Sequence, residues 1–295
     1  MAGQDDRYRQ PMNRMRGWSA LGGKERSVAR MAWATTDHLR YWSLAYSPFR
    51  HPAAGHFFAG HPQREAIARL HLLVASDLGL GLLRSSGGCG TTTLMRYLAA
   101  SHGWGDCAVQ VIYSRGDQPE AGQVWHDLAL KLRLGEPGPD VAARVRSAMV
   151  ADSRQSVRNV WLVDEAGQAA AEVAADLLDQ VPRFAAVLAV REMGPMAADR
   201  QLAVRVGRCP LRLELPPWSL GDSIDYVREM LRRCGGRREI FTDVALVRLH
   251  EVTEGRVAAM SGLAETALAL AASRGETQVG VGVVEEVEER LVRAA

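Results

Sequence analysis

Short, continuous runs of apolar residues recur between residues 80 and 215 of this 295-residue chain. They lack the alternation of polar and apolar residues that marks a strand with one solvent-facing side, so we expect strands buried on both faces. Segments with apolar residues at helical spacing separate them. This alternation indicates an α/β fold with a parallel sheet and right-handed crossovers. The expected strands are residues 80–83, 107–113, 159–163, 184–190 and 211–215.

From Trp218 onward only helical spacing occurs, with expected helices at residues 223–234, 242–252, 257–272 and 281–293. Pro216 and Pro217 close the last expected strand and mark a domain boundary. At the other end, residues 1–40 are polar, rich in arginine and without a sustained period, which is typical of a disordered segment. We therefore expect a basic leader (1–40), an α/β nucleotide-binding domain (41–217) and a helical lid domain (218–295).

A turn of small residues, SSGGCG at residues 85–90, joins the first expected strand to a helix that opens with three threonines. This is the layout of a phosphate-binding P-loop, in which backbone N–H groups and a helix N-terminus face an anion. The usual pattern is G-x-x-x-x-G-K-[ST]. Here a serine replaces the first glycine and a threonine replaces the lysine. The residues predicted to surround a phosphate are Ser85, Gly87, Gly88, Cys89, Gly90, Thr91, Thr92 and Thr93.

An acidic pair, Asp164 and Glu165, follows the apolar run at residues 159–163. In P-loop NTPases, an acid at the end of such a strand and the Ser or Thr of the loop hold Mg2+ beside the nucleotide phosphates. A second residue orients the attacking water. We therefore predict ATP and Mg2+ as cofactors, Thr92 and Asp164 as magnesium ligands, and Glu165 as a catalytic residue.

Charge is distributed unevenly, although the net charge is only +2. Residues 1–50 carry nine basic and four acidic residues, a net +5, so the remainder carries −3. A basic leader can contact nucleic acid or anionic lipid, but such leaders are more often solvated tails. The scattered cysteines have no metal-ligand spacing, and we find no signal peptide or membrane-spanning run. We expect a reduced, cytoplasmic protein without a direct membrane span.

Further segments carry a resemblance to a known family. They include an aromatic stretch at 41–49, HPQREA at 61–66, VDEA at 163–166, LPPWSL at 215–220, FTDVAL at 241–246 and TEG at 253–255. In this order and spacing they resemble the AAA+ ATPases of the general secretion pathway protein A (ExeA-type) family. The chain resembles, more loosely, the AAA+ helper proteins of transposition systems. The resemblance implies an ATP-binding AAA+ fold and assembly into an oligomer.

Several positions depart from the pattern of this family. Besides Ser85 and Thr91, the segment expected to carry the first γ-phosphate sensor reads Ala-Val-Arg191-Glu-Met. The lid turn expected to supply a second sensor arginine reads Gly-Arg256-Val-Ala, so the arginine comes two residues early, about 200° away around a helix. Arg205 occupies the position of an arginine that acts across a subunit interface. The resemblance makes Arg205 a predicted catalytic residue, and a solvent-exposed arginine is the alternative.

Loss of the lysine is expected to weaken nucleotide binding by roughly 10- to 100-fold, the effect of one charge-assisted hydrogen bond. Hydrolysis should suffer more, because negative charge develops where the lysine would lie. We therefore expect an oligomeric switch or scaffold with weak or absent hydrolysis, paired with an AAA+ paralogue or a secretion component. Two alternatives remain open. One is an active ATPase motor rescued by arginines such as Arg84 or Arg96, and the other is a transposition-type helper that binds DNA through residues 1–40.

Overall fold

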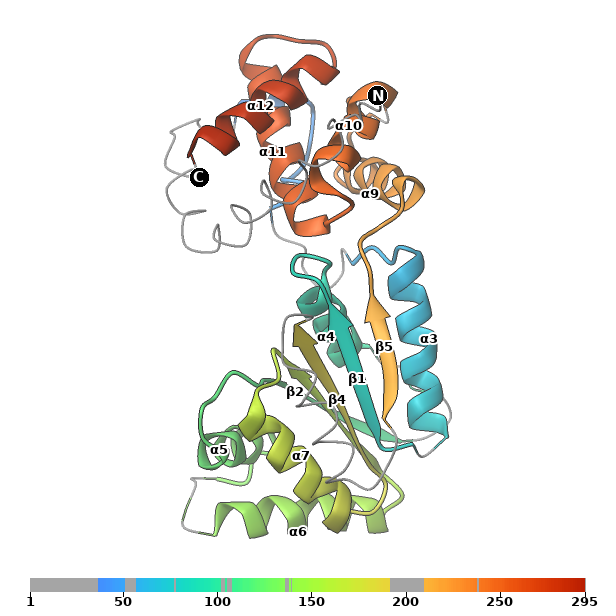
Figure 1. Ribbon diagram of the computed structural model, residues 1–295, viewed down its shortest axis with the longest axis vertical. Helices are drawn as coiled ribbons and strands as arrows, with labels where there is room; N and C mark the ends of the chain where they lie inside the picture. Colours follow the sequence, from blue (N-terminus) through green and yellow to red (C-terminus); the bar gives the residue numbers. More distant parts are fainter. Residues whose placement is uncertain are drawn as a thin grey trace, which may run out of the picture. The chain divides into compact units, whose positions relative to one another are not determined.

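The computed structural model describes residues 37–50, 57–76, 78–101, 104, 108–135, 138, 140–191, 210–237 and 239–294. Contacts divide these residues into two compact units, each described here by itself. The described residues between 57 and 217 form an α/β unit. Residues 37–50 join those from 218 onward in a helical unit (Figure 1). Most of the predicted leader, residues 1–36, lies outside the described residues.

A five-stranded parallel sheet forms the centre of the α/β unit, with the strand order β2-β3-β4-β1-β5. The predicted parallel α/β fold is therefore confirmed. The second strand ends two residues later than predicted, because its pairing with β3 continues to the level of Asp164. The strands are β1 (Leu80–Ser85), β2 (Val109–Arg115), β3 (Arg158–Asp164), β4 (Phe184–Arg191) and β5 (Leu211–Leu215).

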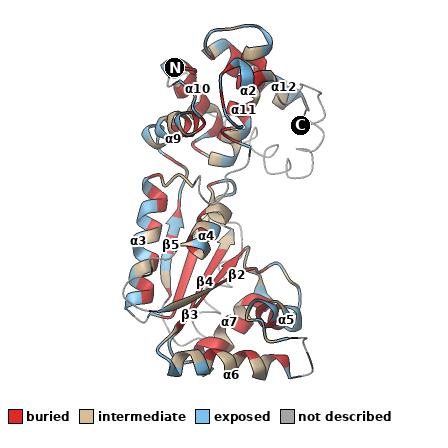
Figure 2. Ribbon diagram, turned by 180° about the vertical axis from the view of Figure 1, so that it is seen from behind, coloured by how far each residue is buried: buried red, intermediate tan, exposed pale blue. Residues whose placement is uncertain are grey.

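Helices cover both faces of this sheet, which explains why its strands are apolar without alternation. Every residue of β3 is buried. Trp161 and Val163 belong to the core on one face, whereas Val160 and Leu162 belong to the core on the other. Figure 2 shows most of the sheet in the colour of buried residues. The first face carries α5 (Ala121–Lys131), α6 (Val141–Arg154) and α7 (Gln168–Gln180), and the second carries α3 (His61–Ala75) and α4 (Thr91–Ala100).

Two helices of the helical unit begin with a side-chain cap. The hydroxyl of Ser219 accepts from Asp222 N–H at the start of α9, and that of Thr242 accepts from Ala245 N–H at the start of α10. Within the described part of the chain, no helix is both long and apolar enough to cross a bilayer. The helices are α2 (Asp37–Tyr41), α9 (Leu220–Arg233), α10 (Asp243–Thr253), α11 (Val257–Ser273) and α12 (Val281–Ala294).

The segment at residues 37–50 packs on the helical unit, although the predicted nucleotide-binding domain begins at residue 41. Trp42 Nε1 donates to the Leu268 carbonyl at 3.0 Å, and His38 Nε2 lies 3.2 Å from Glu265 Oε1. The predicted domain includes residues 41–52, of which the structure describes 41–50. These ten residues pack with the helices that follow residue 217. The aromatic pattern indicates that the segment is buried, but it does not identify the surface that buries it.

A close backbone approach joins the end of α10 to the start of α9. Gly255 has φ 70°, and its carbonyl accepts from Trp218 N–H at 2.9 Å. A Cβ atom on Gly255 would lie 2.2 Å from the Trp218 carbonyl oxygen. Trp218 is itself buried and packs on Tyr226, with 4.8 Å between ring centroids. Only glycine therefore satisfies both the positive φ and the close approach at residue 255.

Substitution of Gly255 tests this packing. Gly255→Ala should lower the free energy of unfolding of the helical unit by about 3 kcal/mol, because backbone strain and overpacking add together. Gly275→Ala is the matched control, since Gly275 has φ 69° but open space around it. The control should lose only about 1 kcal/mol. Urea unfolding followed by circular dichroism measures both losses, and equal losses would contradict the proposed close approach.

Candidate functional site

The predicted P-loop connects β1 directly to α4. β1 ends at Ser85 and α4 begins at Thr91, so residues 86–90 form the whole connection. Gly88 and Gly90 have φ 86° and 87°, a region that other residues rarely adopt. The first N–H groups of α4 have no partner within the helix, and its N-cap residue is a glycine without a capping side chain. The loop and the helix N-terminus thus offer backbone donors to an anion.

The two residues that depart from the P-loop pattern contact each other. Thr91 Oγ1 donates a hydrogen bond to Ser85 Oγ at 2.6 Å. The side chain at the lysine position therefore turns back to the first residue of the loop. Two neutral hydroxyls link the end of β1 to the start of α4, where the usual motif provides a positive charge.

Cys89 anchors the loop to the core beneath it. Its side chain is buried among residues of α3 and α4, and Ser86 Oγ lies 3.2 Å from its sulfur atom. Its carbonyl accepts a hydrogen bond from Gln63 Nε2 of α3 at 3.2 Å. Gln63 is only 1% exposed. We did not predict Gln63 as a site residue. The sequence feature that could have indicated it is a polar amide on the apolar side of a helix.

Asp164, at the end of β3, is buried and already hydrogen-bonded. It is 4% exposed, and its Oδ2 accepts from the Tyr113 hydroxyl of β2 at 3.2 Å. The pKa of the Tyr113 phenol is raised, and burial is the largest cause. A hydrogen bond from Arg96 lowers this pKa, whereas the negative charge of Asp164 raises it. The phenol therefore keeps its proton at neutral pH and acts as the donor. Through Tyr113, Asp164 is connected to Arg96 of α4.

Glu165 lies in an ion pair with the last residue of β2. Arg115 Nη2 is 2.7 Å from Glu165 Oε2 and 2.9 Å from Asp117 Oδ2. The charge of Asp117, and to a smaller extent that of Glu165, raises the pKa of Arg115. Glu165 adopts φ 53°, which is uncommon for a residue other than glycine. Because all three side chains are partly exposed, solvent screens the pair, and its main effect is to set the position of the carboxylate.

Parallel pairing explains why these groups gather at one edge of the sheet. Arg115 lies level with Asp164 in the pairing of β2 with β3. β4 lies between these strands and β1, and its Ala189 pairs level with Leu83 of β1. The carbonyl of Ala189 accepts a hydrogen bond from the N–H of Ala166, the residue that follows the acidic pair. Only β4 therefore lies between β1, which leads into the loop, and β3, which ends in the acidic pair. The backbones of β1 and β3 are about 10 Å apart, twice the spacing of neighbouring strands. We did not predict Tyr113 or Arg115; Tyr113 is the last residue of the expected strand, and Arg115 lies two residues beyond it.

The remaining predicted residues are placed less completely. Thr92 and Thr93 are half-buried in the first turn of α4. Arg205 lies outside the described residues, as do Glu192 and Met193 of the sensor segment. The backbone of Arg191 pairs level with Ser85. In the helical unit, Arg256 is the N-cap residue of α11, and its Nη2 lies 3.5 Å from Glu254 Oε2.

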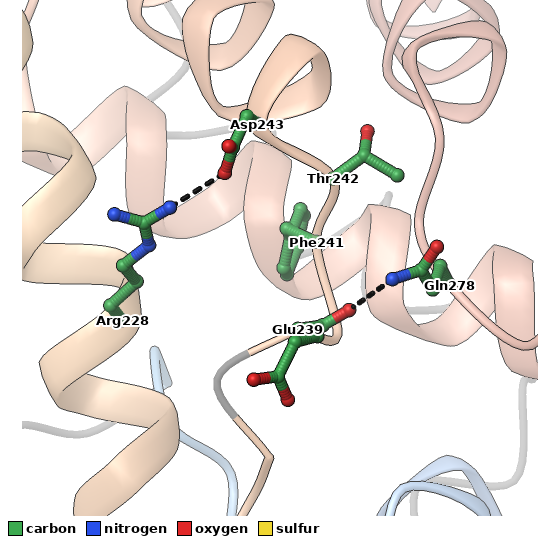
Figure 3. Close-up of a pocket in the computed structure, with 6 residues that line it drawn as sticks. All are labelled: Arg228, Glu239, Phe241, Thr242, Asp243 and Gln278. Atoms are coloured by element: carbon green, nitrogen blue, oxygen red, sulfur yellow. Dashed lines mark hydrogen bonds and ion pairs between the residues drawn. The ribbon is translucent and has the colours of Figure 1, made fainter.

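The helical unit also contains a surface hollow of about 580 Å3 at the start of α10 (Figure 3). Two contacts join polar groups within the hollow. Arg228 Nη2 lies 2.6 Å from Asp243 Oδ1, and Gln278 Nε2 donates to the Glu239 carbonyl at 2.9 Å. We therefore assign no ligand to this hollow. Its lining residues are Arg228, Glu239, Phe241, Thr242, Asp243 and Gln278.

Comparison with known proteins identifies the fold and not the family. No family model matches the chain, and no curated protein matches it. Among solved structures, ORC2 of Aeropyrum pernix in ADPNP and ADP complexes aligns with 76% of this chain, with a TM-score of 0.56 and 17% identity. A chain of Drosophila ORC bound to DNA aligns with 78%, with a TM-score of 0.57 and 19% identity. This chain covers 66% of the ORC2 chain and 60% of the Drosophila chain, less than two thirds of each.

The Holliday junction branch migration motor RuvB of Thermotoga maritima is also similar. It aligns with 82% of this chain and 73% of its own, with a TM-score of 0.51 and 16% identity. At such low identities the likeness concerns the fold alone. The chain has the AAA+ type of P-loop NTPase fold.

Proposed function

We propose that this chain is a nucleotide-binding AAA+ protein in which ATP hydrolysis is weak or absent. The hydrogen bond between Thr91 and Ser85 carries the proposal. It leaves the backbone cradle of the P-loop in place but puts two neutral hydroxyls at its base instead of a lysine. The ADPNP and ADP complexes of ORC2, which shares the fold, support nucleotide binding by this chain.

The residues present fit a nucleotide phosphate and Mg2+. A Cβ on Gly87 would meet nothing within 4 Å, so the loop leaves room for a phosphate group beside its backbone. The hydroxyl of Thr92 and the carboxylate of Asp164 are oxygen donors of the kind that Mg2+ prefers. Bound Mg2+ would supply charge neutralisation at the phosphates. The N–H groups of the loop would bind the phosphates, and Tyr113 would hold the Asp164 carboxylate in place.

Turnover is expected to be weak for two reasons. Thr91 occupies the position of the P-loop lysine, so the charge that develops during phosphoryl transfer lacks its usual partner. Glu165, which would polarise the attacking water, is paired with Arg115. We propose that the protein serves in the cytoplasm as an oligomeric switch or scaffold with an AAA+ paralogue or a component of a secretion pathway. The resemblance to the general secretion pathway protein A family supports this choice of partner.

Phosphate release tests the absence of turnover. Purified protein with ATP and Mg2+ should release phosphate no faster than Glu165→Gln, because the carboxylate does not contribute to turnover. Glu172→Gln, at a half-buried position near the start of α7, is the control. Steady release that is lost in Glu165→Gln and retained in Glu172→Gln would instead identify an active ATPase.

Restoring the lysine tests the cradle itself. Ser85→Gly combined with Thr91→Lys should strengthen ATP binding by roughly 10- to 100-fold, because a positive charge then reaches the phosphates. Thr91→Lys alone should give a smaller gain, since the Ser85 side chain remains at the base of the loop. Thr91→Val, which removes the hydroxyl without adding charge, is the control. Isothermal titration measures these affinities, and equal values for the lysine and valine variants would contradict a preserved phosphate site.

A second candidate function, DNA binding, is favoured by the net charge of +5 on residues 1–50. One structure with this fold, Drosophila ORC, is bound to DNA. This candidate predicts DNA affinity that falls steeply with salt and disappears on deletion of residues 1–36. The deletion stops there because His38 and Trp42 pack on the helical unit. Salt-dependent fluorescence anisotropy measures the affinity, and binding that survives the deletion would exclude the leader as the DNA contact.

A further inference from the structure

We infer that Gln63 is a positioning residue for the phosphate site, because its hydrogen bond to the Cys89 carbonyl aims the Gly90 N–H at the bound phosphate. This inference rests on the proposed nucleotide binding. Gln63 belongs to α3, which precedes β1, and no part of the P-loop pattern includes it.

The position of Gln63 is set by the packing of its helix. Leu70 and Leu73 of α3 are fully buried in the core on the α4 side of the sheet. Gln63 lies near the start of the same helix and is 1% exposed, so its amide is held inside the protein. Cys89, whose side chain is buried in the same core, brings its carbonyl within 3.2 Å of the Gln63 amide nitrogen. Both partners are thus fixed before any ligand arrives.

The hydrogen bond to the Cys89 carbonyl also sets the direction of the Gly90 N–H, because both groups belong to one planar peptide unit. The Cys89 carbonyl and the Gly90 N–H belong to one peptide group, and the two point in opposite directions across a trans peptide bond. The described part of the chain contains no cis peptide bond. With the carbonyl directed at buried Gln63, the Gly90 N–H is directed away from the core. An anion approaches the loop from that side, where Gly87 and Gly88 are exposed.

The missing lysine makes this N–H group more important. Without the lysine, the backbone donors of the loop supply most of its attraction for a phosphate. Gly90 tolerates either sign of φ, so the peptide between Cys89 and Gly90 can turn if its carbonyl loses the Gln63 donor. Gln63 therefore keeps one backbone donor of the loop oriented. The rest of the loop consists of small residues with few side-chain constraints: Ser86, Gly87, Gly88 and Gly90.

The test compares two methionine variants in the same helix of the full chain. Gln63→Met keeps the length of the side chain but removes its donor, whereas Glu65→Met changes a half-exposed neighbour and serves as the control. Affinities for ADP and for pyrophosphate are measured by isothermal titration. Gln63→Met should weaken both by about tenfold, because one charge-assisted hydrogen bond is lost from each complex. The control should bind both like the unaltered protein, and thermal unfolding should show that both variants are folded.

Each result decides the inference. Equal affinities for Gln63→Met and Glu65→Met would overturn it, and so would a loss for ADP without a loss for pyrophosphate, since the effect would then lie at the nucleoside. If the unaltered protein binds neither ligand, the proposed function fails. The Gly90 amide resonance in a 15N spectrum then decides the role of Gln63. A resonance that shifts in Gln63→Met but not in Glu65→Met supports the role, and one that does not shift overturns it.

Discussion

The parallel pairing of the strands is the constraint on which the candidate site depends. Because all the strands of the sheet run in one direction, their carboxyl ends lie at one edge, and the segments that follow them meet there. Ser85 pairs level with Leu215 on one side and with Arg191 on the other. The next two strands along the sheet, β3 and β2, end with Asp164 and Arg115 at a common level. Helices pack on both faces of the sheet behind this edge.

Within that edge, the side chains of the site are engaged mainly with one another. Thr91 is bonded to Ser85, Asp164 to Tyr113, and Glu165 to Arg115. A site with these internal partners is preorganised, so binding does not require its side chains to be ordered first. The same partners occupy groups that hydrolysis would need to use. This combination supports the proposed role of a protein that binds a nucleotide and hydrolyses it weakly or not at all.

The aromatic segment at residues 37–50 changes the view of how the chain is divided. It packs with helices that follow residue 217, so the helical unit is built from both ends of the described chain. The chain therefore passes between the two units twice, once before α3 and once after β5. The first of these passages leads into α3, the helix that carries Gln63.

The sequence by itself determined the sheet, the P-loop and the acidic pair. Each is a local pattern: apolar strands, glycines between a strand and a helix, and acids after a strand. Only the tertiary structure decided which other side chains contact the loop and the acidic pair. Tyr113 and Arg115 reach the acidic pair through strand register, and Gln63 reaches the loop through helix packing. These contacts join residues far apart in the chain, and their geometry depends on strand order and packing that no local pattern specifies.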